Sequence, residues 1–480
     1  MKTTMKNIIF ALSCVAFALT SVSCESELGA LPENAKVDGN TVLDAATAKI
    51  ALNGVYFRFA GVEPTDNTTQ GWKQNERFPS MMAGHMQYGF GIGAGSPELN
   101  QVADYGETYW LYAYRIINAA NSLIVGMDAL PAGRISAADR APIEGEARFL
   151  RAYGHFKLLA YYGQWFDYSS SLGVLLRDEP VTTENMDKAR STVAESYTAI
   201  LSDLDYAIEH CPPQNTKHYA NSWAAKALKA RVLMCRQQAG DYTEVIRLTD
   251  EIINQGAYQL EPLAKDIFRT KGASSSEVIL SISPQPNQPA YPYNRTRQFY
   301  PGASSLYCAT PAFKDLLEGD PRQAWMIGPY RPNYINYFFL KYIAQGEQPT
   351  QVSETHYAIR LTEIYLLKAE AILRSNGDIE DAKSILRTIG SHNGLTDFTA
   401  LNALTNREDI LLYNYYETSK SMVSEDGQEW LCLLRLPLTQ ITAIRPSLTN
   451  TIQYILPVPD SEFQNNALFG DQNPGYGINI

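Results

Sequence analysis

The fold is decided by residues 360–389, RLTEIYLLKAEAILRSNGDIEDAKSILRTI. Apolar side chains recur at helical spacing from Arg360 to Ser375 and again up to Ile389, with Gly377-Asp378 between the two runs. Gly commonly ends a helix and Asp commonly caps the next one. The stretch therefore predicts an antiparallel helical hairpin. The residues expected to meet between its helices are Ile364, Leu367, Ala371, Ile379, Ala382, Ile385 and Leu386.

The same pattern occurs earlier in the chain. Residues 222–238 predict a helix. We expect Gly240 to be its C-terminal cap and Asp241 to be the N-cap of a second helix, which runs to Asn254. Two weaker units lie near 104–162 and 191–239. Repeated hairpins of this kind resemble tetratricopeptide units, which stack to bury a continuous apolar face. Isolated hairpins in an unrelated helical protein are the alternative, but the number of units favours a mainly α fold with a stacked array.

Two further helices show clear periodicity. In residues 44–59 the apolar positions are Ala48, Leu52, Val55 and Phe59, and Asp44 can cap the start. In residues 137–162 the apolar stripe consists of Phe149, Tyr153, Phe156 and Ala160. With these, the predicted hairpins lie near 104–162, 191–256 and 355–390.

Two long segments lack helical periodicity. Residues 61–98 are rich in Gly and aromatic residues, and residues 257–352 are rich in Pro, Tyr and Asn, with one short strand at Glu277–Ser283. Together they predict a large irregular, loop-rich subdomain with a few short strands, and long loops of this kind are usually functional or disordered. The run GFGIGAG at 89–95 lacks the strand-then-helix context of a nucleotide site.

Composition argues against several classes of function. Without residues 1–23 the chain has 38 basic and 51 acidic residues, a formal net charge of −13, and no basic run, so we expect no nucleic-acid partner. Histidines are scattered without i, i+4 spacing, Cys-x-x-Cys is absent, and no carboxylate pair stands out. We therefore expect no metal site built from histidines or cysteines, no cofactor and no enzymatic activity, and the sequence leaves a structural ion undecided. The cysteines interpreted as buried thiols, with one disulfide as the alternative, are Cys211, Cys235, Cys308 and Cys432.

The first residues have the features of an export signal. Lys2 and Lys6 precede the apolar run Ile8–Leu19, which is shorter than the roughly 20 residues of a membrane-spanning helix. We interpret residues 1–23 as a lipoprotein signal peptide, Cys24 as the acylated residue, and 24–43 as the acylated N-terminus and tether. An ordinary signal peptide cut near Ser23 is the alternative.

Three long motifs resemble segments of the SusD/RagB-type outer-membrane lipoproteins. RLTEIYLLKAEAILRSNGD at 360–378 resembles the family's R-x-x-E-x-x-L-x-x-A-E-A helix, and GEARFLRAYGHFKLLAYYGQW at 145–165 resembles its E-A-x-F-L-R-A-x-x-x-F-x-L-x-x-x-Y-G segment. LPVPDSEFQNNALFGDQNPGY at 456–476 resembles the closing L-P-I-P-x-x-E and Q-N-P-G-Y. Residues 426–435, DGQEWLCLLR, depart from E-G-x-R-W-x-D-L-x-R at Glu429 and Cys432, positions thought to be structural.

The resemblance implies a single SusD-like domain over 44–480, a lipid on Cys24 and display on the outer face of the outer membrane. It also implies a SusC-type TonB-dependent transporter as partner and capture of a nutrient without chemical change. The implied nutrient is usually a glycan, and a RagB-like oligopeptide collector is the alternative. A glycan-degrading enzyme would need a carboxylate pair, and a pure protein-interaction scaffold would need no small ligand.

The two irregular regions are where we expect the ligand site. Flat aromatic rings pack under the C–H face of a sugar, while amide and Arg groups bind its hydroxyls, often through water. The residues selected on these grounds are Trp72, Asn75, Arg77 and Tyr88 in the first region, and Tyr291, Tyr293, Asn294 and Trp325 in the second. Core packing is the alternative for each ring.

Overall fold

The computed structural model describes residues 41–61, 71–88, 105–282, 307–329, 336–342, 352–353 and 355–478. The signal peptide, Cys24 and most of the tether lie outside these ranges, as do the GFGIGAG run and the predicted site residues Tyr291, Tyr293 and Asn294. None of the helices in the described ranges combines the length and the apolarity that crossing a membrane requires.

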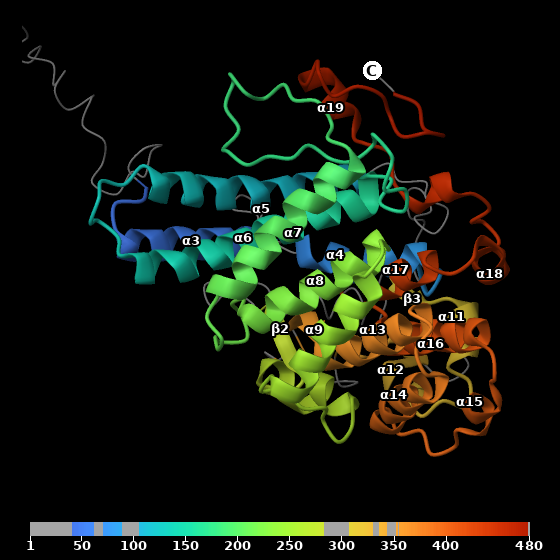
Figure 1. The fold of residues 1–480 in the computed structure, drawn as a ribbon. Coiled ribbons are helices and arrows are strands. Elements are labelled where there is room, and N and C mark those ends of the chain that lie inside the picture. Colours follow the sequence, from blue (N-terminus) through green and yellow to red (C-terminus); the bar gives the residue numbers. More distant parts are fainter. Residues whose placement is uncertain are drawn as a thin grey trace, which may run out of the picture.

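Stacked helices make up most of the structure (Figure 1). The long ones are α3 (Ala45–Phe59), α5 (Tyr105–Asp128), α6 (Ala137–Tyr162), α7 (Val193–His210), α8 (Ser222–Arg236), α9 (Asp241–Gln255), α13 (Leu361–Arg374), α14 (Ile379–His392) and α16 (Arg407–Met422). From α5 to α9 each helix packs on the next, α9 packs on α13, and α13 packs on α14 and α16. The stack therefore continues across the second irregular region, and the prediction of a mainly α hairpin array is confirmed.

Several helix ends follow their sequence signals. Asp44 caps α3 in a reciprocal capping box with Thr47. Asp378 caps α14 by accepting a hydrogen bond from the Glu380 N–H. Both side chains satisfy backbone donors that the first helical turn leaves without partners.

The caps predicted between α8 and α9 are wrong. Gln237, in the left-handed conformation, ends α8, and Gly240, at φ 87°, precedes the first residue of α9. Asp241 is that first helical residue, and its carboxylate binds Arg236 and the Gln238 N–H. The chain thus uses Asp241 to close the turn by an ion pair rather than as an N-cap.

The prediction of which α13 residues contact α14 is also wrong. Ile364, Leu367 and Ala371 belong to the main core, which includes the apolar residues of α8 and α9. The residues that cluster with Ala382, Ile385 and Leu386 of α14 are Leu366, Ala369, Ile372 and Leu373. Because α13 lies between two layers and is apolar on both sides, its periodicity does not identify which face meets α14.

The first irregular region contains a helix that the sequence did not suggest. Helix α4 (Gly71–Met82) is followed by a turn at Gly84, with φ 81°, and by strand β1 (Met86–Tyr88). Phe78 and Met82 are buried in this helix, which packs on α5 and on α17 (Gln428–Leu434). The glycines of this region and Pro79 have a low helix propensity, so the sequence does not indicate a helix here. Tertiary packing overrides that propensity.

Short elements complete the second region and the C-terminal part. The strands are β2 (Val278–Ile282), which is the predicted strand, β3 (Tyr307–Ala309), β4 (Ile327–Pro329), β5 (Tyr337–Phe339) and β6 (His356–Arg360). Strands β2 and β6 pair with each other. The short helices are α11 (Pro311–Leu316), α12 (Gln323–Met326), α15 (Thr399–Ala403), α17 (Gln428–Leu434), α18 (Leu438–Ile444) and α19 (Asp460–Asn465).

Several charged residues of segments 145–165, 360–378 and 426–435 are buried and paired with one another or with neighbouring elements. Their pairs are Arg151–Asp203, Lys157–Asp426, Arg231–Asp426, Arg231–Glu363, Arg360–Glu425 and Arg435–Glu370. Two further buried pairs, Lys341–Glu425 and Arg322–Glu417, lie beside them. A buried charge is costly unless it is paired and hydrogen-bonded. The motif residues therefore hold α6, α8, α13, α16 and α17 in one arrangement.

The two residues that depart from the motif are structural as well. Glu429 is buried and accepts a hydrogen bond from the Ser80 hydroxyl, and burial raises its pKa to about 7. Burial likewise raises the pKa of the Cys432 thiol to about 12. The four cysteines at 211, 235, 308 and 432 are buried free thiols, which agrees with the sequence interpretation.

Candidate ligand-binding surface

A small antiparallel sheet joins the two irregular regions of the sequence. Strand β1 from the first region pairs with β3 from the second, and the strand order is β1-β3-β5-β4. In this register Met86 lies opposite Ala309 and Tyr88 lies opposite Tyr307. Directly opposite residues share one face of a sheet, so Tyr88 and Tyr307 form a cross-strand pair.

Arg77 stabilises the tyrosine pair. The ring centroids of Tyr88 and Tyr307 are 5.3 Å apart. Arg77, in the middle of α4, donates from Nη1 to the Tyr307 hydroxyl at 2.6 Å, and its guanidinium carbon lies 5.3 Å from the Tyr307 ring centroid. Tyr307 is buried whereas Tyr88 is half-buried, so this packing holds the Tyr88 ring at the surface.

Two more half-buried rings border the same apolar cluster. Tyr337 lies opposite Ala309 and therefore on the face of Tyr88, with Lys314 Nζ 4.4 Å from its ring centroid. Trp325 stacks on Phe268, with centroids 5.8 Å apart. We call Arg77, Tyr88, Tyr307, Tyr337 and Trp325 the sheet surface.

Trp72 and Asn75 are core residues, which corrects the expectation that they face a ligand. The Trp72 ring has no exposed area and packs against Phe59 and Tyr153, with centroids 5.1 and 6.1 Å away. Asn75 is equally buried and accepts a hydrogen bond from the Tyr109 hydroxyl. Both side chains point from α4 into the helical stack because α4, unexpected from the sequence, packs on α5.

The structure thus brings Arg77 and Tyr88 together and places Trp325 at the border of the same cluster. Tyr307 and Tyr337 were missed. They begin the three-residue strands YCA and YFF, which are too short to show the alternation that identifies a strand. No local signal would have paired the strand of Tyr307 with β1, which lies more than 200 residues earlier in the chain.

The two carboxyl groups with a pKa raised to about 7 are not placed for catalysis. Burial raises the pKa of both Glu146 and Glu429. Glu146 accepts a hydrogen bond from the Tyr56 hydroxyl and Glu429 accepts one from Ser80, each inside the core. Over the described part of the chain, no three His, Cys, Asp or Glu side chains come together as a metal site would need.

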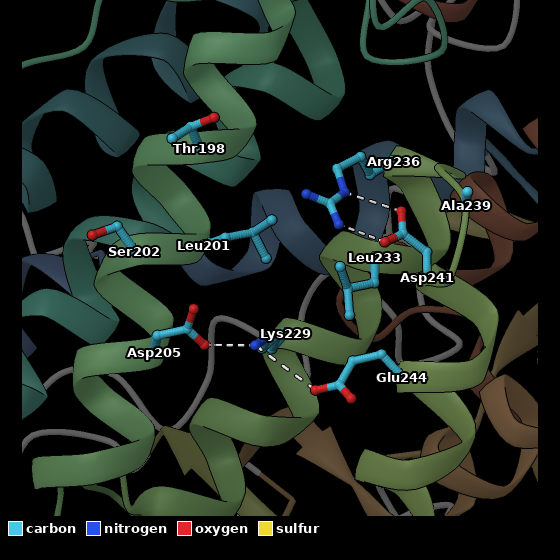
Figure 2. A pocket seen from close by; sticks show the side chains of 11 residues that line it. Thr198, Leu201, Ser202, Asp205, Lys229, Leu233, Arg236, Ala239, Asp241 and Glu244 are labelled. Carbon is cyan, nitrogen blue, oxygen red and sulfur yellow. Dashed lines mark hydrogen bonds and ion pairs between the residues drawn. The ribbon is translucent and has the colours of Figure 1, made fainter.

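A hollow of 660 Å³ lies between α7 and the α8–α9 hairpin (Figure 2). Lys229 Nζ lies 2.5 Å from Asp205 Oδ1 and 3.8 Å from Glu244 Oε1, and Arg236 pairs with Asp241. Each charged side chain of the lining is therefore engaged with another. We interpret these pairs as contacts that join α7, α8 and α9 rather than as groups presented to a ligand.

Comparison with known proteins agrees with this architecture. Residues 61–234 match the model of a family described as SusD-like, "starch-binding associating with outer membrane". A SusD-like protein of Bacteroides ovatus is 22% identical over 317 residues, which is 58% of this chain and 57% of that relative. Residues 61–234 of this chain therefore resemble SusD-like proteins. The match spans little more than half the length of the B. ovatus protein.

Solved structures share the fold of this chain. A SusD superfamily protein from Bacteroides thetaiotaomicron superposes with a TM-score of 0.73 at 22% identity, over 90% of this chain and all of the other. A laminarin-binding SusD-like protein superposes with a TM-score of 0.71 at 21% identity, over 91% of this chain and all of the other.

Proposed function

We propose that this SusD-like chain is a lipid-anchored outer-membrane protein that binds a glycan at the cell surface and delivers it to a SusC-type TonB-dependent transporter. The observation that carries the proposal is the sheet surface. Two segments far apart in the sequence meet there and hold Tyr88, Tyr337 and Trp325 half-exposed. Rings in that state can offer an apolar face while their polar edges stay hydrated.

The ligand class has independent support. The matching family is described as starch-binding, and a protein of the same fold is described as laminarin-binding. Both are glucose polymers, whose sugar rings have an apolar C–H face and hydroxyl edges. In the proposed complex Tyr88, Tyr337 and Trp325 pack under sugar rings, Arg77 donates to hydroxyls, and Tyr291, Tyr293 and Asn294 add contacts.

Titration calorimetry of the purified chain with laminarin and starch oligosaccharides tests the ligand. Tyr88→Ala and Trp325→Ala each weaken binding about two- to ten-fold, which corresponds to ~0.5–1.5 kcal/mol per ring contact. The matched control is Tyr242→Ala, which removes another half-buried tyrosine, on α9. Binding of oligopeptides with no response to any glycan would replace the glycan by the RagB-like alternative.

Anchoring and partnership need separate experiments. A single acyl chain holds a protein only marginally, so lipoprotein-type acylation with more than one chain is required for stable attachment. Radiolabelled palmitate enters the wild-type chain but not Cys24→Ala, and protease added to intact cells digests the chain. Affinity purification from membranes recovers a TonB-dependent barrel. If the wild-type chain takes up no palmitate, or if protease added to intact cells leaves the chain undigested, surface anchoring is contradicted.

A further inference from the structure

A second hollow lies beside the first half of α5. It has a volume of 430 Å³ and is bordered by the end of α3, by the loop before α7 and by α19. Figure 1 shows α19 on the same side of the molecule as α5. The apolar lining of the hollow includes Leu111, Tyr114, Leu175, Val181 and Met186. We call it the α5 hollow.

Large apolar side chains of the α5 hollow are held at the surface. Leu111, Val181 and Met186 are 41%, 47% and 37% exposed. Polar contacts fix the loop that carries two of them. The Val181 N–H donates to Asn118 Oδ1 at 2.9 Å, and the buried Arg177 guanidinium donates to the carbonyl of Met186. The hollow is therefore formed before anything fills it, and exposed apolar patches of this kind mark interaction sites.

An exposed stripe of α5 connects the hollow with the start of the described chain. Helical residues three or four positions apart lie on one face. The residues at that spacing are Leu111, Arg115, Asn118, Ser122 and Val125, and all but Asn118 are exposed. At the far end of the stripe Val42 packs beside Gly126, where an added Cβ would lie 2.9 Å from Val42 Cγ2. The chain that precedes Val42 therefore joins the molecule on the face of α5 that leads to the hollow.

The segment that precedes Val42 is long enough to reach the hollow. Gly126 and Leu111 are ~22 Å apart along α5, at about 1.5 Å per residue. An extended chain covers about 3.3 Å per residue, so residues 34–41 span up to ~26 Å. Residues 25–33 can therefore lie over the α5 hollow without any change in the described structure.

The charge and the polarity of residues 25–33 are complementary to those of the hollow. The charged residues of the lining are Arg58, Arg115, Arg177 and Glu462, three cations against one acid, in a chain whose net charge is −11. Arg58 is half-buried and forms no ion pair with another of the described residues. Residues 25–33 read ESELGALPE, in which three acids surround two leucines and no cation occurs. A segment of this composition can fill the apolar wall and neutralise the excess positive charge.

We propose that residues 25–33 dock in the α5 hollow of the same molecule. The two leucines pack on the apolar wall, and the glutamates lie beside Arg58 and Arg115. A short connection holds the segment at a millimolar effective concentration, so even weak contacts keep it docked. If Cys24 carries the proposed lipid, docking turns the α5 side of the molecule toward the membrane. That orientation rests on the proposed function, whereas the docking itself does not.

Disulfide trapping of the full-length protein in isolated membranes tests the docking. Leu31→Cys is combined with Val181→Cys in the hollow. The matched control combines Leu31→Cys with Ile50→Cys on α3, which is 53% exposed and closer to Val42 along the chain. Under mild oxidation we expect the first pair to form an intramolecular disulfide at least about ten-fold faster than the control pair, because docking raises the effective concentration at the hollow alone. Equal rates, or a faster control, refute the docking.

A charge exchange tests the complementarity. Arg115→Glu places an acid beside the docked glutamates, so we expect trapping of Leu31→Cys by Val181→Cys to slow about three-fold, the size of an exposed ion-pair effect. The matched control is Lys49→Glu, which changes an exposed charge on α3 and leaves the rate unchanged. Adding Glu27→Lys and Glu33→Lys to the Arg115→Glu chain restores the rate.

The remaining outcomes separate the docking from the proposed function. No effect of Arg115→Glu, or no recovery with the two added lysines, refutes the docking. A disulfide between two molecules refutes it as well, because a second copy would then occupy the hollow. None of these rates depends on a glycan or on the acyl chain. Failure of the docking therefore leaves glycan binding intact, and absence of the palmitate label leaves the docking intact.

Discussion

Replacing Arg231 by Met removes the centre of the buried ion-pair system. Arg231 binds Glu363, Asp426 and the Ala358 carbonyl, and it has almost no exposed area. After the change Asp426 keeps Lys157 at 2.7 Å, whereas Glu363 keeps no partner among the described side chains. The main cost is therefore one uncompensated buried carboxylate, and breaking a buried pair in this way costs about 3–5 kcal/mol of unfolding free energy.

Guanidinium denaturation at pH 7.5 measures this loss. The matched control is Arg247→Met on α9, since Arg247 is about half exposed and pairs with Glu244 and Glu251. Exposed pairs contribute about 0–1 kcal/mol, so the control changes little. Burial already raises the pKa of Glu363 despite Arg231. In Arg231→Met this carboxyl takes up a proton more readily, so the deficit shrinks as the pH falls.

A double variant isolates the pair. Arg231→Met with Glu363→Met replaces both charges by apolar groups of similar size, and such replacements are often neutral or stabilising. We expect the double variant to recover most of the loss. The reasoning is refuted if Arg231→Met is as mild as Arg247→Met, or if the double variant is as unstable as the single one.

Two further substitutions and one labelling experiment give simpler tests. Glu429→Gln stabilises the protein at pH 8 but not at pH 4. The folded-state pKa of Glu429, about 7, exceeds its ordinary value of 4.5, so the wild type loses stability as the pH rises between those values. Equal profiles of unfolding free energy against pH for the two proteins would contradict this. Gly84→Ala lowers the unfolding temperature more than Gly133→Ala does. Both glycines have positive φ, but only a Cβ at Gly84 would lie against another residue, 2.5 Å from Arg445 Cδ. Equal shifts in unfolding temperature would contradict the steric argument. The four thiols at 211, 235, 308 and 432 react with a thiol reagent only after unfolding, and rapid reaction of the native protein would show that they are not buried.

Much of the helical fold follows from local sequence signals. The Asp44 cap and the positions Ala48, Leu52, Val55 and Phe59 predict α3, and the structure has that helix with those four residues buried. Such features depend on neighbours three or four residues away. The facing of α13 depends instead on which layers surround it, and a helix with apolar residues on two sides does not specify this.

The candidate site was predictable only in part. Arg77, Tyr88 and Trp325 were selected because their regions are irregular and aromatic, and the structure places them around one apolar cluster. Trp72 was selected on the same grounds but is buried, because an aromatic residue carries the same signal in a core and at a surface. Tyr307 joins the site through pairing with a strand distant in sequence, which no local pattern encodes.

The packing of α9 on α13 has a consequence for how ligand preference can change. Residues 256–360 leave the helical stack and return to it at adjacent helices, so this segment is an insertion that could be exchanged between relatives as a unit. The exchange has an electrostatic condition. Arg322, Lys341 and Arg360 of this segment pair with Glu417 and Glu425, which belong to the C-terminal part of the scaffold. A grafted segment must therefore supply cations in the places of these three, or the recipient must lose both acids.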